Sequence, residues 1–123
     1  MKWSFFLIGL GGAVGSICRF LLQLLVRKYW ATTFPIGTFA VNILGCFVIG
    51  ILYGLFAKYN GIAEEWRLLL IVGICGGFTT FSSFSYESIV LFRNGDYLYF
   101  FTYVSLSVII GLLATFLGMI MIK

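Results

Sequence analysis

The chain has 123 residues, of which 62% are hydrophobic and 10% charged, with a mean hydropathy of +1.10 and a net charge of +4. This composition excludes an ordinary soluble domain, and the positive charge forms no basic patch of the kind that binds nucleic acid. Because histidine is absent and the cysteines stand alone, the sequence offers no imidazole metal site, no CxxC pair and no catalytic triad, so an enzyme is not expected.

Four apolar runs follow one another along the chain, and each exceeds the roughly 20 residues that span a hydrocarbon core. The first is too long for the apolar region of a signal peptide. The turns between the runs are short. The sequence therefore predicts an all-α, multi-pass membrane protein with a single four-helix transmembrane domain over residues 1–123 and no implied soluble partner. The predicted spans are residues 3–26, 35–57, 67–92 and 97–122.

The first span contains a positive charge about two-thirds of the way along it, at Arg19. Its side chain either extends to the membrane surface or lies in a wet vestibule that attracts an anion. Gly11 and Gly15 precede it four residues apart, a spacing that lets another helix approach closely.

The second span carries Thr38 and Asn42 on one helical face. An asparagine amide inside a membrane needs a partner, which is either another helix or a passing ligand. Gly50 and Gly54 form a GxxxG pair further along, which most simply indicates close packing.

The third span is interrupted by GGFTTFSSFS at residues 76–85. Adjacent glycines and hydroxyl residues are poor helix formers, so a broken helix is predicted here. Membranes tolerate a break only where protein or a water-filled cavity satisfies the freed backbone groups, and transporters and channels place ion sites at such breaks. The alternative interpretation is a packing face of small residues.

Phenylalanines recur around this break at positions 78, 81 and 84. Aromatic rings have positive edges, so they can stabilise a small anion without a formal charge. Glu87 lies one turn further on and is the one carboxylate clearly inside a span. It pairs with Arg19, lines a vestibule or carries protons. In the fourth span Tyr103 and Ser107 begin a stripe of small and hydroxylated residues that either lines a path or packs.

The positive charges give almost no orientation signal. One side carries Lys2, Lys58, Arg67 and Lys123, and the other carries Arg27, Lys28 and Arg93. Because cationic residues near span ends set orientation, this balance permits insertion in both directions and an antiparallel dimer.

Three motifs resemble the Fluc/CrcB family of small bacterial fluoride channels. GAVGSICRF at residues 12–20 is similar to the first-span G-x-x-G-A-x-x-R-Y, with Ser16 and Phe20 as departures. GTFAVNILG at 37–45 is similar to G-T-x-x-V-N-x-x-G, and the segment 76–85 to G-G-x-T-T-F-S-T-F-S, with Ser83 in place of threonine. Length and span number agree, so the resemblance covers the whole chain.

The resemblance implies an antiparallel, dual-topology homodimer in the bacterial inner membrane, with two pores for passive fluoride export and a structural sodium ion between the subunits. Backbone carbonyls of Gly76 and Thr79 would hold the sodium, and Arg19 and Glu87 would lie in or near the vestibule. Asn42 would donate to fluoride, and Phe81 and Phe84 would present ring edges. The remaining implied pore residues are Thr38, Thr80, Ser82, Ser83, Tyr103 and Ser107.

Three alternatives stay open at this point. A small multidrug/proton antiporter also has four spans, but it needs a carboxylate in its first span, and only Glu87 is available here. A non-transporting membrane assembly subunit would use Asn42 and the break for packing alone. Some members of the family work as paired, oppositely oriented subunits rather than as homodimers.

Overall fold

The computed structural model describes residues 3–122, and the regular structure within this range is helical. Four helices in it are long and apolar enough to cross a membrane, as the sequence predicts. Lys2 and Lys123, which enter the charge count above, lie outside the described residues. The four spans cover Ser4–Tyr29, Ile36–Lys58, Glu64–Arg93 and Tyr97–Ile120.

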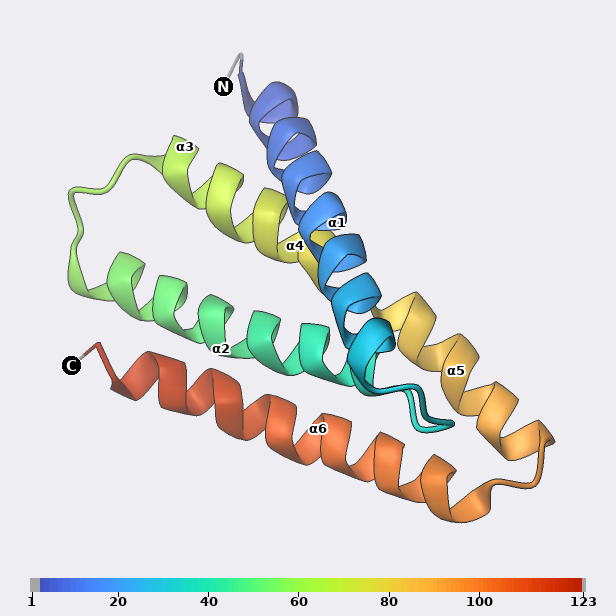
Figure 1. Ribbon diagram of the computed structural model, residues 1–123. Helices are drawn as coiled ribbons and strands as arrows, with labels where there is room; N and C mark the ends of the chain where they lie inside the picture. The colour runs from blue at the N-terminus through green and yellow to red at the C-terminus, as the bar shows by residue number, and fades with distance from the viewer. Residues whose placement is uncertain (1–2, 123) are drawn as a thin grey trace.

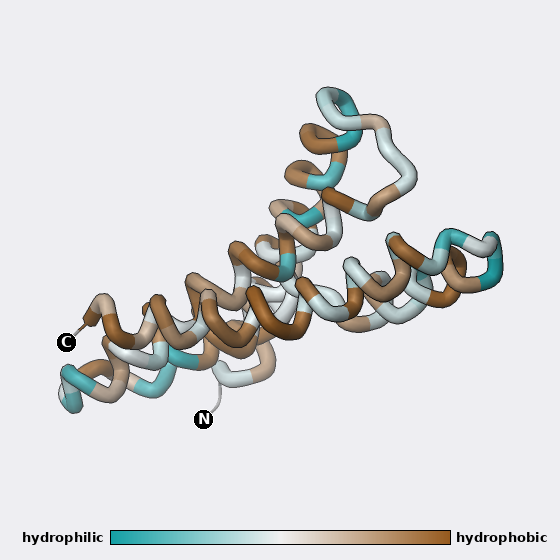
Figure 2. Tube along the Cα trace, turned by 90° about the horizontal axis from the view of Figure 1, so that it is seen from below, coloured by the Kyte–Doolittle hydropathy of each residue, from teal (hydrophilic) through white to brown (hydrophobic). Residues whose placement is uncertain are grey.

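The helices form two packed pairs rather than a closed bundle (Figure 1). Helix α1 (Ser4–Tyr29) crosses the first half of the third span, while α2 (Ile36–Lys58) runs beside α6 (Tyr97–Ile120). Hydrophobic residues line the helices, and the most hydrophilic positions gather mainly at turns and helix ends (Figure 2). The arrangement leaves long helical faces without a partner inside the chain.

The third span consists of several pieces. It begins with α3 (Glu64–Arg67), continues as the π-helical segment η1 (Leu68–Cys75) and ends its first half with the short α4 (Gly76–Phe78). After the break comes α5 (Phe81–Arg93), which packs against α6. The interruption agrees with the prediction from segment 76–85, whereas no sequence signal predicted the π-helical segment.

The break itself lies at Thr79 and Thr80, whose backbones are extended, with ψ of 159° and 116°. The Thr80 hydroxyl accepts a hydrogen bond from the Ser83 N–H at 3.1 Å and so caps α5. Threonine is well suited to this position because its side-chain oxygen satisfies an amide that a new helix leaves free. Thr79 therefore ends the first half of the span, and Thr80 starts the second.

Glycines allow α1 to touch the third span backbone to backbone. A Cβ added at Gly11 would lie 2.9 Å from the Gly73 Cα, and one added at Gly77 would lie 2.5 Å from the Gly12 carbonyl oxygen. A Cβ added at Gly15 would meet the Ile74 carbonyl oxygen at 2.1 Å. The close approach predicted from Gly11 and Gly15 is confirmed.

A second glycine contact joins α2 and α6. A Cβ added at Gly50 would lie 2.2 Å from the Thr115 carbonyl oxygen, and one at Gly118 would lie 2.4 Å from that of Phe47. The predicted packing role of Gly50 is confirmed. At Gly54 the nearest atom is a side-chain carbon of Ile122, 3.1 Å away, so this position is less tightly constrained.

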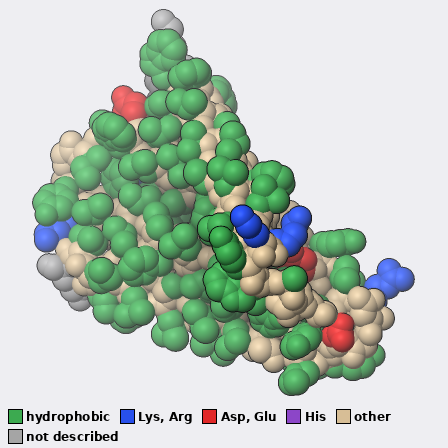
Figure 3. Space-filling view, viewed as in Figure 1, with side chains coloured by type: hydrophobic (Ala, Val, Ile, Leu, Met, Phe, Trp, Pro, Cys, Tyr) green, Lys and Arg blue, Asp and Glu red, His purple; other side chains and the backbone are tan. Residues whose placement is uncertain are grey.

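The buried core is thin for a chain this apolar. It contains Val26, Val41, Ile71, Cys75, Leu91, Tyr103 and Ala114. Hydrophobic side chains cover most of the face seen in Figure 3, and the charged ones appear in a few separate places. A surface of this kind suits lipid or a partner subunit, because water would not solvate it.

Replacing Gly15 with alanine should destabilise the protein by about 1–3 kcal/mol, because the new methyl group would collide with backbone atoms that cannot rotate away. Thermal unfolding in detergent measures the effect. Gly9→Ala is the matched control, since a Cβ at Gly9 has nothing within 4 Å. Equal melting temperatures for the two variants would contradict the tight crossing.

Candidate ion pathway

The side-chain amide of Asn42 forms hydrogen bonds to backbone groups at the break. Its Oδ1 accepts from the Thr80 N–H at 2.8 Å, and its Nδ2 donates to the Thr80 carbonyl oxygen at 3.0 Å. Both backbone groups of Thr80 are therefore satisfied by one side chain on a neighbouring span. An asparagine amide has two N–H donors, and the second one makes no hydrogen bond within the described residues. It remains available for a ligand.

Arg19 also forms a hydrogen bond to the backbone beside the break. Its Nε donates to the Gly77 carbonyl oxygen at 3.1 Å, and the Ser16 hydroxyl lies 3.5 Å from the same oxygen. The pairing of Arg19 with Glu87 that the sequence left open is not formed, because the oxygens of Glu87 accept from Thr38 and Tyr103 instead.

Two carbonyl groups at the break lose the amides that would bond to them in an unbroken helix. The Thr80 N–H, the usual partner of the Gly76 carbonyl, donates to Asn42. The Ser83 N–H, the usual partner of the Thr79 carbonyl, donates to the Thr80 hydroxyl. Unwound backbone carbonyls are the groups that hold sodium in membrane proteins, so these two positions fit a sodium ion chemically. Residues 3–122 contain no group of three or more acidic, cysteine or histidine side chains that would bind a metal otherwise.

A cavity of about 330 Å³ opens beside the break. The Ser107 hydroxyl is buried without a hydrogen-bond partner among the described residues. The Phe81 and Phe84 rings lie 5.8 Å apart between centroids, and Phe81 is 79% exposed. The cavity thus combines an amide N–H, hydroxyl groups and aromatic rings, with no charged side chain. Its lining includes Asn42, Thr79, Thr80, Phe81, Phe84 and Ser107.

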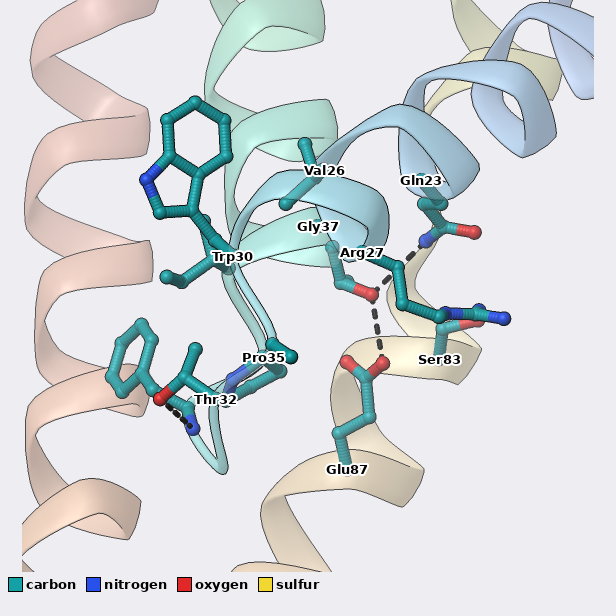
Figure 4. Close-up of a pocket in the computed structure, with 13 residues that line it drawn as sticks. Gln23, Val26, Arg27, Trp30, Thr32, Pro35, Gly37, Ser83 and Glu87 are labelled. Carbon is teal, nitrogen blue, oxygen red and sulfur yellow. Dashed lines mark hydrogen bonds between the residues drawn. The ribbon is translucent and has the colours of Figure 1, made fainter.

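A second cavity, of about 430 Å³, lies between the C-terminal end of α1, the start of α2 and the N-terminal half of α5 (Figure 4). Gln23 donates to the Thr38 hydroxyl at 3.1 Å, and Thr38 donates to Glu87 at 2.8 Å. The Tyr103 hydroxyl donates to the other Glu87 oxygen at 2.9 Å. Side chains from all four spans therefore meet in one hydrogen-bonded chain. We call this space the vestibule cavity; its polar lining includes Gln23, Arg27, Thr38, Ser83 and Glu87.

The structure does not bring all of the predicted site residues together in one place. Thr38, Ser83 and Glu87 line the vestibule cavity. Ser82 is exposed on α5, with its hydroxyl 3.4 Å from that of Thr80. Tyr103 is fully buried and holds Glu87 rather than lining either cavity. Arg19 lines neither cavity. The predicted site residues that line the smaller cavity are Asn42, Thr79, Thr80, Phe81, Phe84 and Ser107.

Sequence reasoning missed Gln23. The available signal was its position one helical turn after Arg19, which places two polar side chains on the same face of an apolar helix. A polar residue inside a span calls for a partner, and here the partner is Thr38.

A family model described as "CrcB-like protein, Camphor Resistance (CrcB)" matches residues 6–119, nearly the whole chain. The chain belongs to the CrcB family. The resemblance read from the three motifs is thereby confirmed, and each motif contributes to the break or to its surroundings: Arg19 binds the Gly77 carbonyl, and Asn42 binds Thr80.

Relatives in the CrcB family are similar over their full lengths. The fluoride-specific ion channel FluC of Flavobacterium psychrophilum is 47% identical over 120 residues, which are 98% of this chain and 97% of that protein. The protein of the same name from Phocaeicola vulgatus is 50% identical over 115 residues, 94% of each chain. That from Azobacteroides pseudotrichonymphae is 46% identical over 121 residues, 98% of this chain and 97% of that protein. These relatives are named as ion channels, in agreement with the expectation that the chain is not an enzyme.

Asn42→Leu should lower the free energy of unfolding by about 2 kcal/mol or more, because it leaves the Thr80 N–H and carbonyl unpaired in apolar surroundings. Thr115→Val is the control, since it removes a single hydrogen bond from a hydroxyl to the Cys46 carbonyl. Denaturation in detergent compares the two. A loss for Asn42→Leu no larger than that for Thr115→Val would show that the amide does not support the break.

Proposed function

We propose that the chain forms a fluoride-selective channel. The observation that carries this proposal is the smaller cavity, whose lining contains two phenylalanine rings and no charged side chain. One Asn42 N–H and the Ser107 hydroxyl, both in this lining, have no hydrogen-bond partner within residues 3–122. Donors and ring edges suit an anion. The names of the full-length relatives support fluoride as the anion.

The chemistry of the cavity favours fluoride over chloride. Fluoride is small and strongly hydrated, so a selective path must replace its water with close hydrogen-bond donors in a narrow space. A wide ring of lysines or arginines would attract either anion without distinguishing them. The two cavities are adjacent along two elements: Thr38 and Asn42 lie one turn apart on α2, and Ser83 and Phe84 are neighbours on α5. We infer that fluoride passes from one cavity to the other along these neighbouring residues of α2 and α5.

The direction of flow follows from electrostatics. Hydrogen fluoride enters a cell as a neutral weak acid and ionises inside. The inside-negative membrane potential then favours exit of the anion, by about 2.3 kcal/mol per 100 mV. A passive pore in the bacterial inner membrane is therefore sufficient to export cytoplasmic fluoride.

We infer that two chains assemble as an antiparallel homodimer. Phe81, Ser82 and Ser85 are exposed on α5 within a membrane span, and exposed hydroxyl groups at this depth need a protein or water partner rather than lipid. The balanced positive charge permits insertion of both copies in opposite directions. A sodium ion between the subunits would be held by the carbonyls of Gly76 and Thr79. A paired heterodimer remains the alternative assembly.

Purified protein in liposomes should release fluoride rapidly after addition of a potassium ionophore, and should release chloride far more slowly. A fluoride electrode and a chloride electrode measure the two rates. Proton-coupled drug transport that disappears in Glu87→Gln would instead support the antiporter. Folded protein that moves neither ion would leave a packing subunit or a missing partner chain, and crosslinking would separate those two outcomes.

Phe81→Ile should reduce the ratio of fluoride to chloride release by roughly three- to tenfold, because it keeps apolar bulk and removes the ring edge. The same two-electrode assay measures it. Phe5→Ile is the matched control, because Phe5 is comparably exposed, at 89%, but lies on α1 away from both cavities. An unchanged ratio in Phe81→Ile would remove its ring from the selective path.

A further inference from the structure

Gln23 has no part in the function proposed above, although its amide lies in the wall of the vestibule cavity (Figure 4). It lies on α1 and reaches across to α2, where its Nε2 donates to the Thr38 hydroxyl at 3.1 Å. The side chain is partly buried. An amide held in this way inside a membrane protein has a function in packing or in the site it borders.

The Thr38 hydroxyl has a single proton, and the direction of that proton is fixed by its two neighbours. Because Gln23 donates to the hydroxyl oxygen, the oxygen acts as an acceptor on that side. Its one proton then points to Glu87, whose Oε2 is 2.8 Å away. Thr38 is only 2% exposed, and both of these hydrogen bonds are made to side chains of the protein. The chain of hydrogen bonds runs in one direction, from Gln23 through Thr38 to Glu87.

The last group in this series of hydrogen bonds is the Glu87 carboxylate, which lines the cavity proposed above as part of the anion pathway. Both Glu87 oxygens accept hydrogen bonds, one from Thr38 and the other from the fully buried Tyr103. These two donors draw the carboxylate toward α2 and α6. Since a like charge a few ångströms from a passing anion repels it strongly in a site of low dielectric, the position of this carboxylate affects conduction.

We propose that Gln23 is a positioning residue for anion conduction, which rests on the function proposed above. Its amide sets the direction of the Gln23–Thr38–Glu87 hydrogen bonds and thereby holds the Glu87 carboxylate at the wall of the vestibule cavity, against its two donors, so that it does not extend into the open space. Gln23 acts through Thr38 and need not touch the anion. Arg27, on the same helix, lines the cavity and supplies its positive charge.

Variants that reverse the donor-to-acceptor direction of the Gln23–Thr38–Glu87 hydrogen bonds test this proposal. In Gln23→Glu the new carboxylate competes with Glu87 for the single Thr38 proton, so fluoride release from liposomes should fall by about tenfold or more. In Gln23→Glu/Glu87→Gln the amide at position 87 donates to Thr38, which donates to the carboxylate at position 23. Tyr103 still donates to the amide oxygen. Every donor in this series of hydrogen bonds then has an acceptor again. The rate of fluoride release should return to within about threefold of the rate of Glu87→Gln alone.

This rescue separates positioning from a purely structural role, because two changes that merely loosened the packing would add to each other. Additive losses in the double variant, or an unchanged rate in Gln23→Glu, would overturn the proposal. Thr115→Val is the control for general loss of an interhelical hydrogen bond and should leave the rate unchanged. Fluoride release by the unaltered protein is measured first, so failure of the proposed channel function is seen separately.

A second pair of variants serves if Gln23→Glu does not fold. Gln23→Leu should reduce fluoride release by roughly threefold in the unaltered background and by nothing further in a Thr38→Val background, because Gln23 acts only through that hydroxyl. Equal reductions in both backgrounds would overturn the proposal.

Discussion

The structure depends on one requirement of the bilayer, that every backbone polar group inside it finds a partner. A helix interrupted at Thr79 and Thr80 exposes several such groups at once. The Asn42 amide, the Arg19 guanidinium and the Thr80 hydroxyl take the places of the missing helical partners. These polar side chains, which would be costly anywhere else in the membrane, are stabilising here because the break needs them.

Close helix contacts make this arrangement possible. Arg19 reaches the Gly77 carbonyl because Gly15, one turn earlier, lets α1 lie directly on the third span. Packing between small residues supplies the association energy that the hydrophobic effect does not provide inside lipid. The glycine contacts therefore bring the helices close together, and the polar side chains form hydrogen bonds across the short distance that results.

Much of this was predictable from the sequence, because hydropathy and glycine spacing are local signals. They predicted the four spans, the close approach at Gly11 and Gly15, and an interruption in segment 76–85. The pairings between spans were not predictable in the same way. The sequence around Asn42 is the same whether its amide binds another helix or an ion. The role of Gln23 depends on its hydrogen bond to Thr38, 15 residues away, which no local pattern indicates. The π-helical segment η1 consists of ordinary apolar residues and a glycine, so no local sequence pattern marks it, and it packs against α1.

The pairing of Asn42 with Thr80 also bears on whether the pathway opens and closes. For the third span to become one continuous helix, the Thr80 N–H would return to the Gly76 carbonyl, and Asn42 would lose both of its partners together. The helix would regain a bond that it could form in any sequence, while an uncompensated amide would remain in apolar surroundings. The interrupted form is thus held in place by the neighbouring span. This feature favours a permanently formed passage over one that is gated by refolding of the helix.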